Sequence, residues 1–319
     1  MIATAKAPEK PVRFRVIPAE TGMTLRNLLI RRVRDLDRDT AAELVKAGGV
    51  YINRLRIRLP MIRVAAGERV TVYREALRSS PLEPSALQIR YRAPDFVVID
   101  KPAGVAVSPT RGTARGTLSE ALASRLESEG VARPYVGVVH RLDRGASGLV
   151  VLTTRSAANA SLHQQFVDHD IRRTYLILVE GQPPDELRCE APLAHTSQGG
   201  VRIAKADEPS AKPAVTRFRR LGTREFDGQR RNLVQAELET GRTHQIRAHA
   251  AHAGFPVVGD RRYGAPPPLS RLGAAPVDLE FVECLCLHAW RLRFNHPTTG
   301  EPLEFTSPPP AWAGVVEPS

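Results

Sequence analysis

Short apolar segments rich in Val, Ile and Leu dominate the sequence from residue 88 to residue 307. Polar turns separate these segments, and few stretches between them have helical periodicity, 156–170 being one, with Ser156 as its expected N-cap. Many strands with few intervening helices favour a mixed, largely antiparallel sheet. The segments 288–297 and 301–310 predict a closing hairpin. The sequence therefore predicts an α+β fold in which helices flank a mixed, largely antiparallel β-sheet.

The N-terminal part of the chain concentrates positive charge. The whole sequence of 319 residues has a net charge of +12. Residues 11–75 contain 14 Lys and Arg against 7 Asp and Glu, so more than half of the excess lies in about a fifth of the chain. An arginine-rich genome would spread the charge over the whole chain, whereas a concentrated excess favours a polyanionic partner such as RNA.

An alternating pattern within this basic segment predicts one strand over residues 53–59. The two faces of that strand would carry Leu55, Ile57 and Leu59 on one side and Arg54, Arg56 and Arg58 on the other. With the apolar face buried, the three guanidiniums form a surface suited to RNA phosphates. The alternative is an ordinary solvated strand face, but such faces usually mix Lys, Glu and Thr. The pattern therefore favours RNA binding.

The order of elements in the N-terminal segment resembles a known RNA-binding module. Helical periodicity covers residues 24–34, and a second helix is expected over 39–47, with Asp39 or Thr40 as its N-cap. The stretches "GGVYIN" and "AAGERVTVY" follow. Together they resemble the S-four-like domain first recognised in a small-subunit ribosomal protein. The resemblance implies a small α/β RNA-binding domain over residues 11–75.

Composition divides the rest of the chain. Residues 76–87 are rich in Ser and Pro and predict a linker, residues 88–307 a catalytic domain, and residues 308–319 an irregular Pro-rich tail. No apolar run is long enough to cross a bilayer, and the N-terminus has no apolar signal core. We therefore expect a cytoplasmic protein without a membrane partner.

Metal and hydrolase chemistry have weak support. The three cysteines are Cys189, Cys284 and Cys286. They form no CxxC pair, which argues against a disulfide framework or a zinc site and fits a reducing compartment. His244, His249 and His252 are a possible metal cluster, but their spacing does not share one helix face and no acid or cysteine adds a further ligand. Ser147 lies in "GASGL", which lacks the nucleophile-elbow pattern of hydrolases.

One loop places a carboxylate among arginines. In "GVVHRLDRGASGLVVLTT", residues 137–154, Asp143 lies between Arg141 and Arg144 with strand-like segments on both sides. A surface turn with an incidental ion pair is the ordinary interpretation of such a pattern. A comparable strand–turn–strand pattern is expected over residues 95–107, "DFVVIDKPAGVAV". The residues around Asp143 alone do not distinguish a structural turn from a catalytic one.

Three ordered stretches resemble the motifs of the RluA-type pseudouridine synthases. They are "HRLDRGASGLVVL", "RRTYLILVEG" and "GRTHQIRAHAAHAGFPVVGDRRYG". The stretch "VVIDKPAGV" resembles the strand and turn that open the catalytic domain of that family, and the match spans roughly residues 88–307. With an S-four-like domain in front, the chain resembles the subgroup that modifies large-subunit ribosomal RNA. The resemblance implies isomerisation of uridine to pseudouridine, without a cofactor or a metal.

The resemblance also assigns roles to particular residues. Asp143 is the carboxylate that acts on the ribose, as nucleophile or as base, and Arg247 is its partner. Tyr175 stacks on the target ring or helps to move its proton, although a strand tyrosine is more often core packing. Arg141 fills the space left by the extruded base. The remaining expected RNA contacts are Arg54, Arg56, Arg58, Arg242, His244 and Gln245.

Two alternatives remain open at this stage. The chain could be a catalytically idle RNA-binding protein that assists ribosome assembly, although the presence of Asp143 favours an enzyme. It could also act on tRNA in place of ribosomal RNA. We expect a monomer whose partner is RNA.

Overall fold

The computed structural model describes residues 11–74, 82–109, 116–196, 200–205, 207–264 and 285–316. These residues form two compact units, one comprising the chain up to Ala86 together with Ser108–Arg125, the other Leu87–Val107 together with the chain from Leu126 onward. Most of the expected linker, 76–87, lies outside the described residues, and the expected domain boundaries remain a prediction. Within the described ranges, no helix is long and apolar enough to cross a membrane.

The first unit contains a four-stranded antiparallel sheet and two helices. Its strands, in the spatial order β1-β4-β2-β3, are β1 (Val12–Arg15), β4 (Arg69–Val72), β2 (Val50–Ile52) and β3 (Leu55–Ile57). The helices are α1 (Leu25–Arg32) and α2 (Arg38–Lys46), preceded by the 3₁₀ turn η1 (Pro18–Glu20). Leucines of both helices form one buried core with valines of β2 and β4. The amphipathic periodicity of the helices therefore explains the packing of this unit.

The helix starts differ in part from the expectation. The Thr24 hydroxyl caps α1 by accepting a hydrogen bond from the Asn27 amide at 3.4 Å. The second helix is capped by Asp37, whose carboxylate accepts from the Thr40 amide at 2.7 Å. The expected N-caps Asp39 and Thr40 were wrong by two and three residues, because "DRDT" offers several residues that can cap.

Of the strand expected over residues 53–59, only β3, Leu55–Ile57, forms, and the residues before it turn back to β2. Asn53 and Arg54 have positive φ values of 49° and 76°, and they form the two-residue turn between β2 and β3. Two consecutive residues with positive φ are typical of a tight hairpin turn. The alternation of Leu and Arg did not reveal this turn, because the same alternation fits a continuous strand. Leu55 is 71% exposed and Leu59 is 69% exposed, so of the expected apolar face only Ile57 packs against the core.

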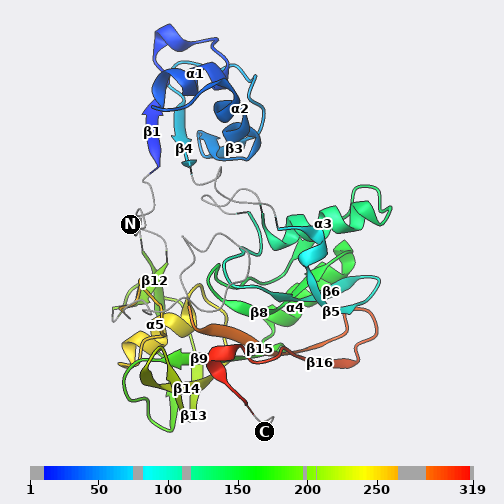
Figure 1. Ribbon diagram of the computed structural model, residues 1–319, viewed down its shortest axis with the longest axis vertical. Helices are drawn as coiled ribbons and strands as arrows, with labels where there is room; N and C mark the ends of the chain where they lie inside the picture. Colours follow the sequence, from blue (N-terminus) through cyan, green and yellow to red (C-terminus); the bar gives the residue numbers. More distant parts are fainter. Residues whose placement is uncertain are drawn as a thin grey trace. The chain divides into compact units, whose positions relative to one another are not determined.

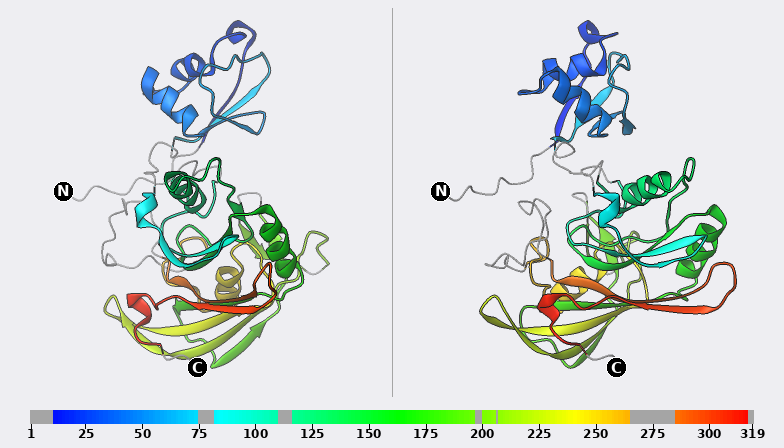
Figure 2. Two further views of the ribbon diagram at one scale, coloured as in Figure 1. Left: turned by 90° about the vertical axis from the view of Figure 1, so that its right-hand side faces the viewer. Right: turned by 45° about the vertical axis from the view of Figure 1, so that its right-hand side comes forward.

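The second unit is built on a ten-stranded sheet (Figures 1 and 2). Its main path has the order β10-β13-β14-β9-β15-β8-β6-β5, while β16 pairs with β15 and β7 with β8. The strands are β5 (Gln88–Arg92), β6 (Phe96–Lys101), β7 (Gly137–Val138), β8 (Ser147–Thr153), β9 (Arg172–Val179), β10 (Glu186–Cys189), β13 (Thr216–Phe226), β14 (Gln229–Leu238), β15 (Leu287–Asn295) and β16 (Pro302–Thr306). Of the strand pairs in this sheet that the structure describes, β15 with β8 is parallel and the others are antiparallel. The expected α+β class with a mixed, largely antiparallel sheet is confirmed.

The remaining helices, 3₁₀ turns and a small hairpin belong mainly to this unit. They are α3 (Leu118–Ser128), α4 (Ser156–Val167), α5 (Gln245–His252), the two-stranded sheet of β11 (Leu193–His195) and β12 (Val201–Ile203), and the 3₁₀ turns η3 (Pro84–Ala86) and η5 (Ala311–Ala313), with η3 and the start of α3 assigned to the first unit. Leu162 of α4 packs into a core with residues of β6, β8 and β15. In Figure 1, α5 (yellow) lies beside β12.

Four local expectations for this unit have different outcomes. The closing hairpin is confirmed, since β15 and β16 pair in antiparallel register from Arg291–Thr306 to Asn295–Pro302. Residues 105–107 are buried but form no strand, because the chain after the Lys-Pro-Ala-Gly turn packs inward without a ladder partner. The helix α4 begins at Ser156 and its N-cap is Arg155, so Ser156 is not the cap. The start of the expected irregular tail places the Trp312 side chain in the core with Leu176 and Trp290.

Candidate active site

The topology brings Asp143 close to the centre of the large sheet. Asp143 lies in the loop between β7 and β8, just before the N-terminal end of β8. In the register of the sheet, Ala289 of β15 pairs with Gly148 of β8 on one side and with Tyr175 of β9 on the other. Gly148 has a φ of 103°, and a Cβ there would lie 2.3 Å from the Ala289 carbonyl oxygen. Only glycine therefore permits this close approach of β8 to β15.

An arginine links Asp143 to a second, fully buried carboxylate. One terminal guanidinium nitrogen of Arg247 donates to Asp143 Oδ2 at 2.9 Å. The Nε and the other terminal nitrogen donate to the two oxygens of Asp260 at 2.7 and 2.8 Å. The Arg247 side chain is 3% exposed and that of Asp260 is not exposed, whereas that of Asp143 is 20% exposed. Asp260 therefore anchors the arginine, and Asp143 is the carboxylate that faces outward.

The charge of Arg247 is strongly stabilised. Burial alone opposes a charged guanidinium, but the hydrogen bonds and negative charges of Asp260 and Asp143 outweigh burial and raise the pKa of Arg247 above its usual value. Asp260 is itself held in place, since its Oδ1 also accepts from the backbone amides of Arg262 and Tyr263 at 3.0 and 3.1 Å. The arginine is therefore a permanent cation beside Asp143.

Polar contacts on the opposite face of α5 fix the helix that carries Arg247. The Gln245 side-chain amide donates to the Val215 carbonyl and to the Thr216 hydroxyl, and its oxygen accepts from the Thr240 hydroxyl. His249 Nε2 lies 2.8 Å from the Ala191 carbonyl, which can only accept, so Nε2 donates and Nδ1 accepts from Thr216. Burial lowers the pKa of His249, consistent with this neutral form. Residues four apart thus attach α5 to the sheet while Arg247 points toward Asp143.

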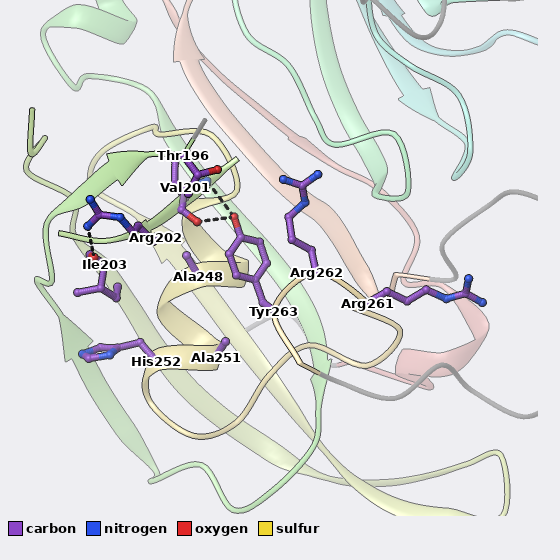
Figure 3. A pocket seen from close by; sticks show the side chains of 10 residues that line it. All are labelled: Thr196, Val201, Arg202, Ile203, Ala248, Ala251, His252, Arg261, Arg262 and Tyr263. Atoms are coloured by element: carbon purple, nitrogen blue, oxygen red, sulfur yellow. Dashed lines mark hydrogen bonds between the residues drawn. The ribbon is translucent and has the colours of Figure 1, made fainter. Parts of the chain in front are cut away.

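His244 connects the Asp143 site to a neighbouring pocket. It precedes α5 with a φ of 51°, and its Nε2 lies 3.7 Å from Asp143 Oδ1. Its Nδ1 is 3.1 Å from the Tyr263 hydroxyl, which also lies 3.1 Å from the Val201 carbonyl oxygen. Tyr263 lines a pocket of about 750 Å³ between α5 and the β11–β12 hairpin (Figure 3). The pocket is bordered by the basic residues Arg202, His252, Arg261 and Arg262.

The loop that carries Asp143 is fastened at both ends. At its start, His140 Nε2 accepts a hydrogen bond from the Val151 amide at 3.0 Å, and burial lowers the pKa of His140 to about 3, so the ring is neutral. At its end, the Arg144 carbonyl accepts from Lys101 Nζ at 3.3 Å and from the Gly104 amide at 2.8 Å. These contacts restrict the backbone on either side of the carboxylate.

Tyr175 lies on β9 and is almost fully buried, with 6% of its surface exposed. Burial raises the pKa of its hydroxyl, the charge of Arg173 opposes this rise, and that of Asp143 adds to it. The tyrosine therefore stays protonated at neutral pH. Its position matches both interpretations from the sequence, since it belongs to the packed interior and is electrostatically coupled to Asp143.

The other expected site residues differ in their exposure to solvent. Arg141 and Arg242 are exposed, and the latter also donates to the Pro213 carbonyl at 3.1 Å. Gln245 is 2% exposed and its amide is engaged within the fold, which argues against the expected RNA contact and gives it a structural role. Arg54 lies in the β2–β3 turn of the first unit and Arg56 donates to the Tyr51 hydroxyl at 2.8 Å.

Two further observations complete the comparison with the sequence. Arg58 of the first unit is exposed, as expected for a surface arginine. The sequence predictions did not include Asp260, although an acid one glycine after the apolar run "FPVV", in the same motif as Arg247, was a usable signal. Within the described ranges, no group of three or more His, Cys, Asp or Glu side chains could hold a metal ion. Cys189 and Cys286 are buried free thiols, and Cys284 lies outside the described residues.

Comparisons with known proteins agree on one family. Residues 95–252 match the family described as RNA pseudouridylate synthase. An uncharacterised RNA pseudouridine synthase of Chloroflexus aurantiacus is 37% identical over 94% of this chain and 91% of its own. The ribosomal large subunit pseudouridine synthase D of Zymomonas mobilis is 33% identical over 91% of both chains. The solved structure of human RNA pseudouridylate synthase domain containing 1 is 26% identical, with a TM-score of 0.56 over 72% of this chain and 86% of its own.

Proposed function

Because the chain belongs to the RNA pseudouridine synthase family, we propose that it isomerises specific uridines of large-subunit ribosomal RNA, with Asp143 as the catalytic carboxylate. The observation that carries this proposal is the contact between Asp143 and Arg247, two residues 104 positions apart in the sequence. An ordinary surface carboxylate has no need of an arginine that is buried and held by two hydrogen bonds to another carboxylate, as Arg247 is held by Asp260. The arrangement instead suits a carboxylate that must remain charged while a substrate covers it.

The reaction breaks the bond from ribose C1′ to uracil N1 and forms a bond from C1′ to C5. The uracil supplies both the leaving and the attacking atom, so the proton lost from C5 is balanced by one gained at N1. We propose that Asp143 acts on the ribose, as nucleophile or as base, through Oδ1, since Oδ2 is engaged by Arg247. Arg247 stabilises the carboxylate charge and fixes its orientation.

Two further residues are proposed to handle the target nucleotide. Tyr175 is buried beside the site and keeps its proton, so it can stack on the uracil ring or donate toward it. Arg141 is exposed two residues before Asp143, where it can fill the gap beside an extruded base. Base extrusion is required because the reacting atoms are shielded within stacked RNA.

Ribosomal RNA is favoured over tRNA as the substrate. Relatives that match over nine tenths of this chain are named ribosomal large subunit pseudouridine synthases, from Zymomonas mobilis and Yersinia pestis among others. The positive charge of residues 11–75 supports a second, phosphate-based contact to a large RNA. We also propose that this segment is an S-four-like RNA-binding domain.

The test compares Asp143→Asn with Asp170→Asn, an exposed acid after α4. Asp143→Asn keeps the shape of the side chain and removes its charge, so we expect RNA binding to persist and pseudouridine formation to fall below detection. Asp170→Asn should retain both. Mapping of pseudouridines in ribosomal RNA and tRNA from a deletion strain complemented with each variant gives the readout. Pseudouridine formation by purified Asp143→Asn protein would contradict the catalytic assignment, and sites lost only from tRNA would contradict the ribosomal target.

A further inference from the structure

A buried arginine outside the Asp143–Arg247–Asp260 cluster has no acidic partner. Arg173 lies on β9, two residues before Tyr175, so the two side chains share one face of the strand. Arg173 is 8% exposed, whereas its neighbour Arg172 is exposed on the other face. Among the residues that the structure describes, Arg173 forms no ion pair, and its Nε is buried without a hydrogen-bond partner.

The guanidinium of Arg173 lies among the segments that build the active site. Its central carbon is 5.3 Å from the centroid of the Phe166 ring, and that ring stacks on His140 at 5.1 Å. His140 begins the loop of Asp143. On another side, a Cβ at Gly241 would lie 2.5 Å from one terminal nitrogen of Arg173. The φ of Gly241 is not positive, so a larger residue there would conflict with the end of the Arg173 side chain and not with the backbone conformation.

A fold that buries a cation without a counter-charge is destabilised unless another group supplies the charge. Stacking on Phe166 offsets only part of this loss, since aromatic rings attract cations weakly compared with anions. The negative charge of Asp143 is already engaged by Arg247. The substrate of the proposed function, by contrast, carries one phosphate per nucleotide, and a guanidinium binds phosphate through two parallel hydrogen bonds.

We propose that Arg173 is a phosphate-binding residue that holds the RNA backbone next to the target uridine. The inference rests on the proposed function, because the phosphate belongs to the RNA that Asp143 acts on. Gly241, just before α5, leaves room for the end of the Arg173 side chain, and Tyr175 lies two residues further along β9 on the same face. A phosphate bound here would hold the nucleotide at the face of β9 that carries Tyr175.

The experiment measures RNA affinity without turnover. Arg173→Gln is introduced into full-length Asp143→Asn protein, and Arg172→Gln, which removes the same charge from the exposed face, is the matched control. The probe is an unmodified transcript of the large-subunit ribosomal RNA, titrated at several salt concentrations. We expect Arg173→Gln to weaken binding by roughly tenfold. The slope of log affinity against log salt should fall by ~0.7–0.9, the value for one lost phosphate contact.

Melting temperatures separate this role from a structural one. Removing an unpaired buried cation should leave the melting temperature unchanged or raise it, and Arg173→Lys should keep the salt slope while weakening affinity. Unchanged affinity and salt slope in both Arg173 variants would overturn the inference, as would equal effects of Arg172→Gln. Those outcomes do not depend on the proposed function. The proposed function would fail on a different result, namely pseudouridine formation by Asp143→Asn protein without a substitution at Arg173.

Discussion

A buried lysine beneath the Asp143 loop gives the protein a defined pH dependence of stability. Lys101 is fully buried, and its Nζ donates to the carbonyls of Pro102, Val105 and Arg144 at 2.9, 2.8 and 3.3 Å. Burial lowers the pKa of Lys101 from 10.5 to about 7, although the negative charge of Asp143 acts in the opposite direction. The lysine therefore loses its proton far more easily in the folded protein than in the unfolded chain.

The sign and size of the effect follow from proton binding. Between pH 7 and pH 10.5 the unfolded chain binds the proton of Lys101 and the folded protein increasingly does not, so stability rises with pH. Below pH 7 both states are protonated and the contribution is constant. A pKa difference of one unit corresponds to ~1.4 kcal/mol. With the pKa at about 7, the free energy of unfolding should therefore rise by about 2 kcal/mol between pH 7 and pH 9.

The variant Lys101→Met removes the titrating group at similar length. Unfolding is followed by tryptophan fluorescence at pH 7 and pH 9, and Trp290 and Trp312, the two tryptophans of the chain, both belong to the unit that holds Lys101. The difference between the wild-type and variant pH responses cancels the other titrating groups. The exposed Lys205→Met is the control and should behave as wild type. Equal pH responses of wild type and Lys101→Met would refute the reasoning.

Other substitutions test the remaining parts of the site. Arg247→Lys keeps a charge but cannot serve two carboxylates, so single-turnover rates should fall at least about tenfold; Arg247→Ala leaves the buried Asp260 unpaired and should lower the free energy of unfolding by ~3–5 kcal/mol in denaturant titrations. Arg141→Ala should leave the melting temperature nearly unchanged and slow modification of structured RNA more than of a short unstructured RNA; equal slowing of both would argue against base extrusion by this residue. Arg54→Gln should lower the salt slope of RNA affinity by ~0.7–0.9, and an unchanged slope would exclude Arg54 from the RNA contact.

Short apolar segments predicted the class of the large sheet well because one or both faces of its strands are buried. Period-two patterning was a weaker guide in the first unit. It failed at residues 53–59, where the sheet is small, β3 is an edge strand and a turn of two residues in the left-handed region interrupts the pattern. Asn53 was a signal for that turn, since Asn tolerates positive φ. Short, exposed elements leave little hydrophobic pattern to interpret.

The candidate site was predictable only through motif resemblance. Nothing in the local sequence indicates that Asp143 meets Arg247, because the contact depends on how β8, β9, β15 and α5 assemble. Gln245 shows the opposite difficulty, since a polar residue two positions before the arginine that contacts Asp143 looks like a ligand contact until its hydrogen bonds inside the fold are known. The function of a polar side chain on a short helix depends on which face it occupies.

The position of β15 also sets the order in which the site can form during synthesis. In the sheet β15 lies between β8 and β9, although its residues, Leu287–Asn295, follow both strands in the sequence. A nascent chain that has emerged only to α5 already contains Asp143, Tyr175 and Arg247, yet β8 and β9 each still present an unpaired edge. Such edges can pair with other chains until they are covered. The strand that joins the two halves of the sheet therefore also covers the edges that leave the growing chain open to misassembly.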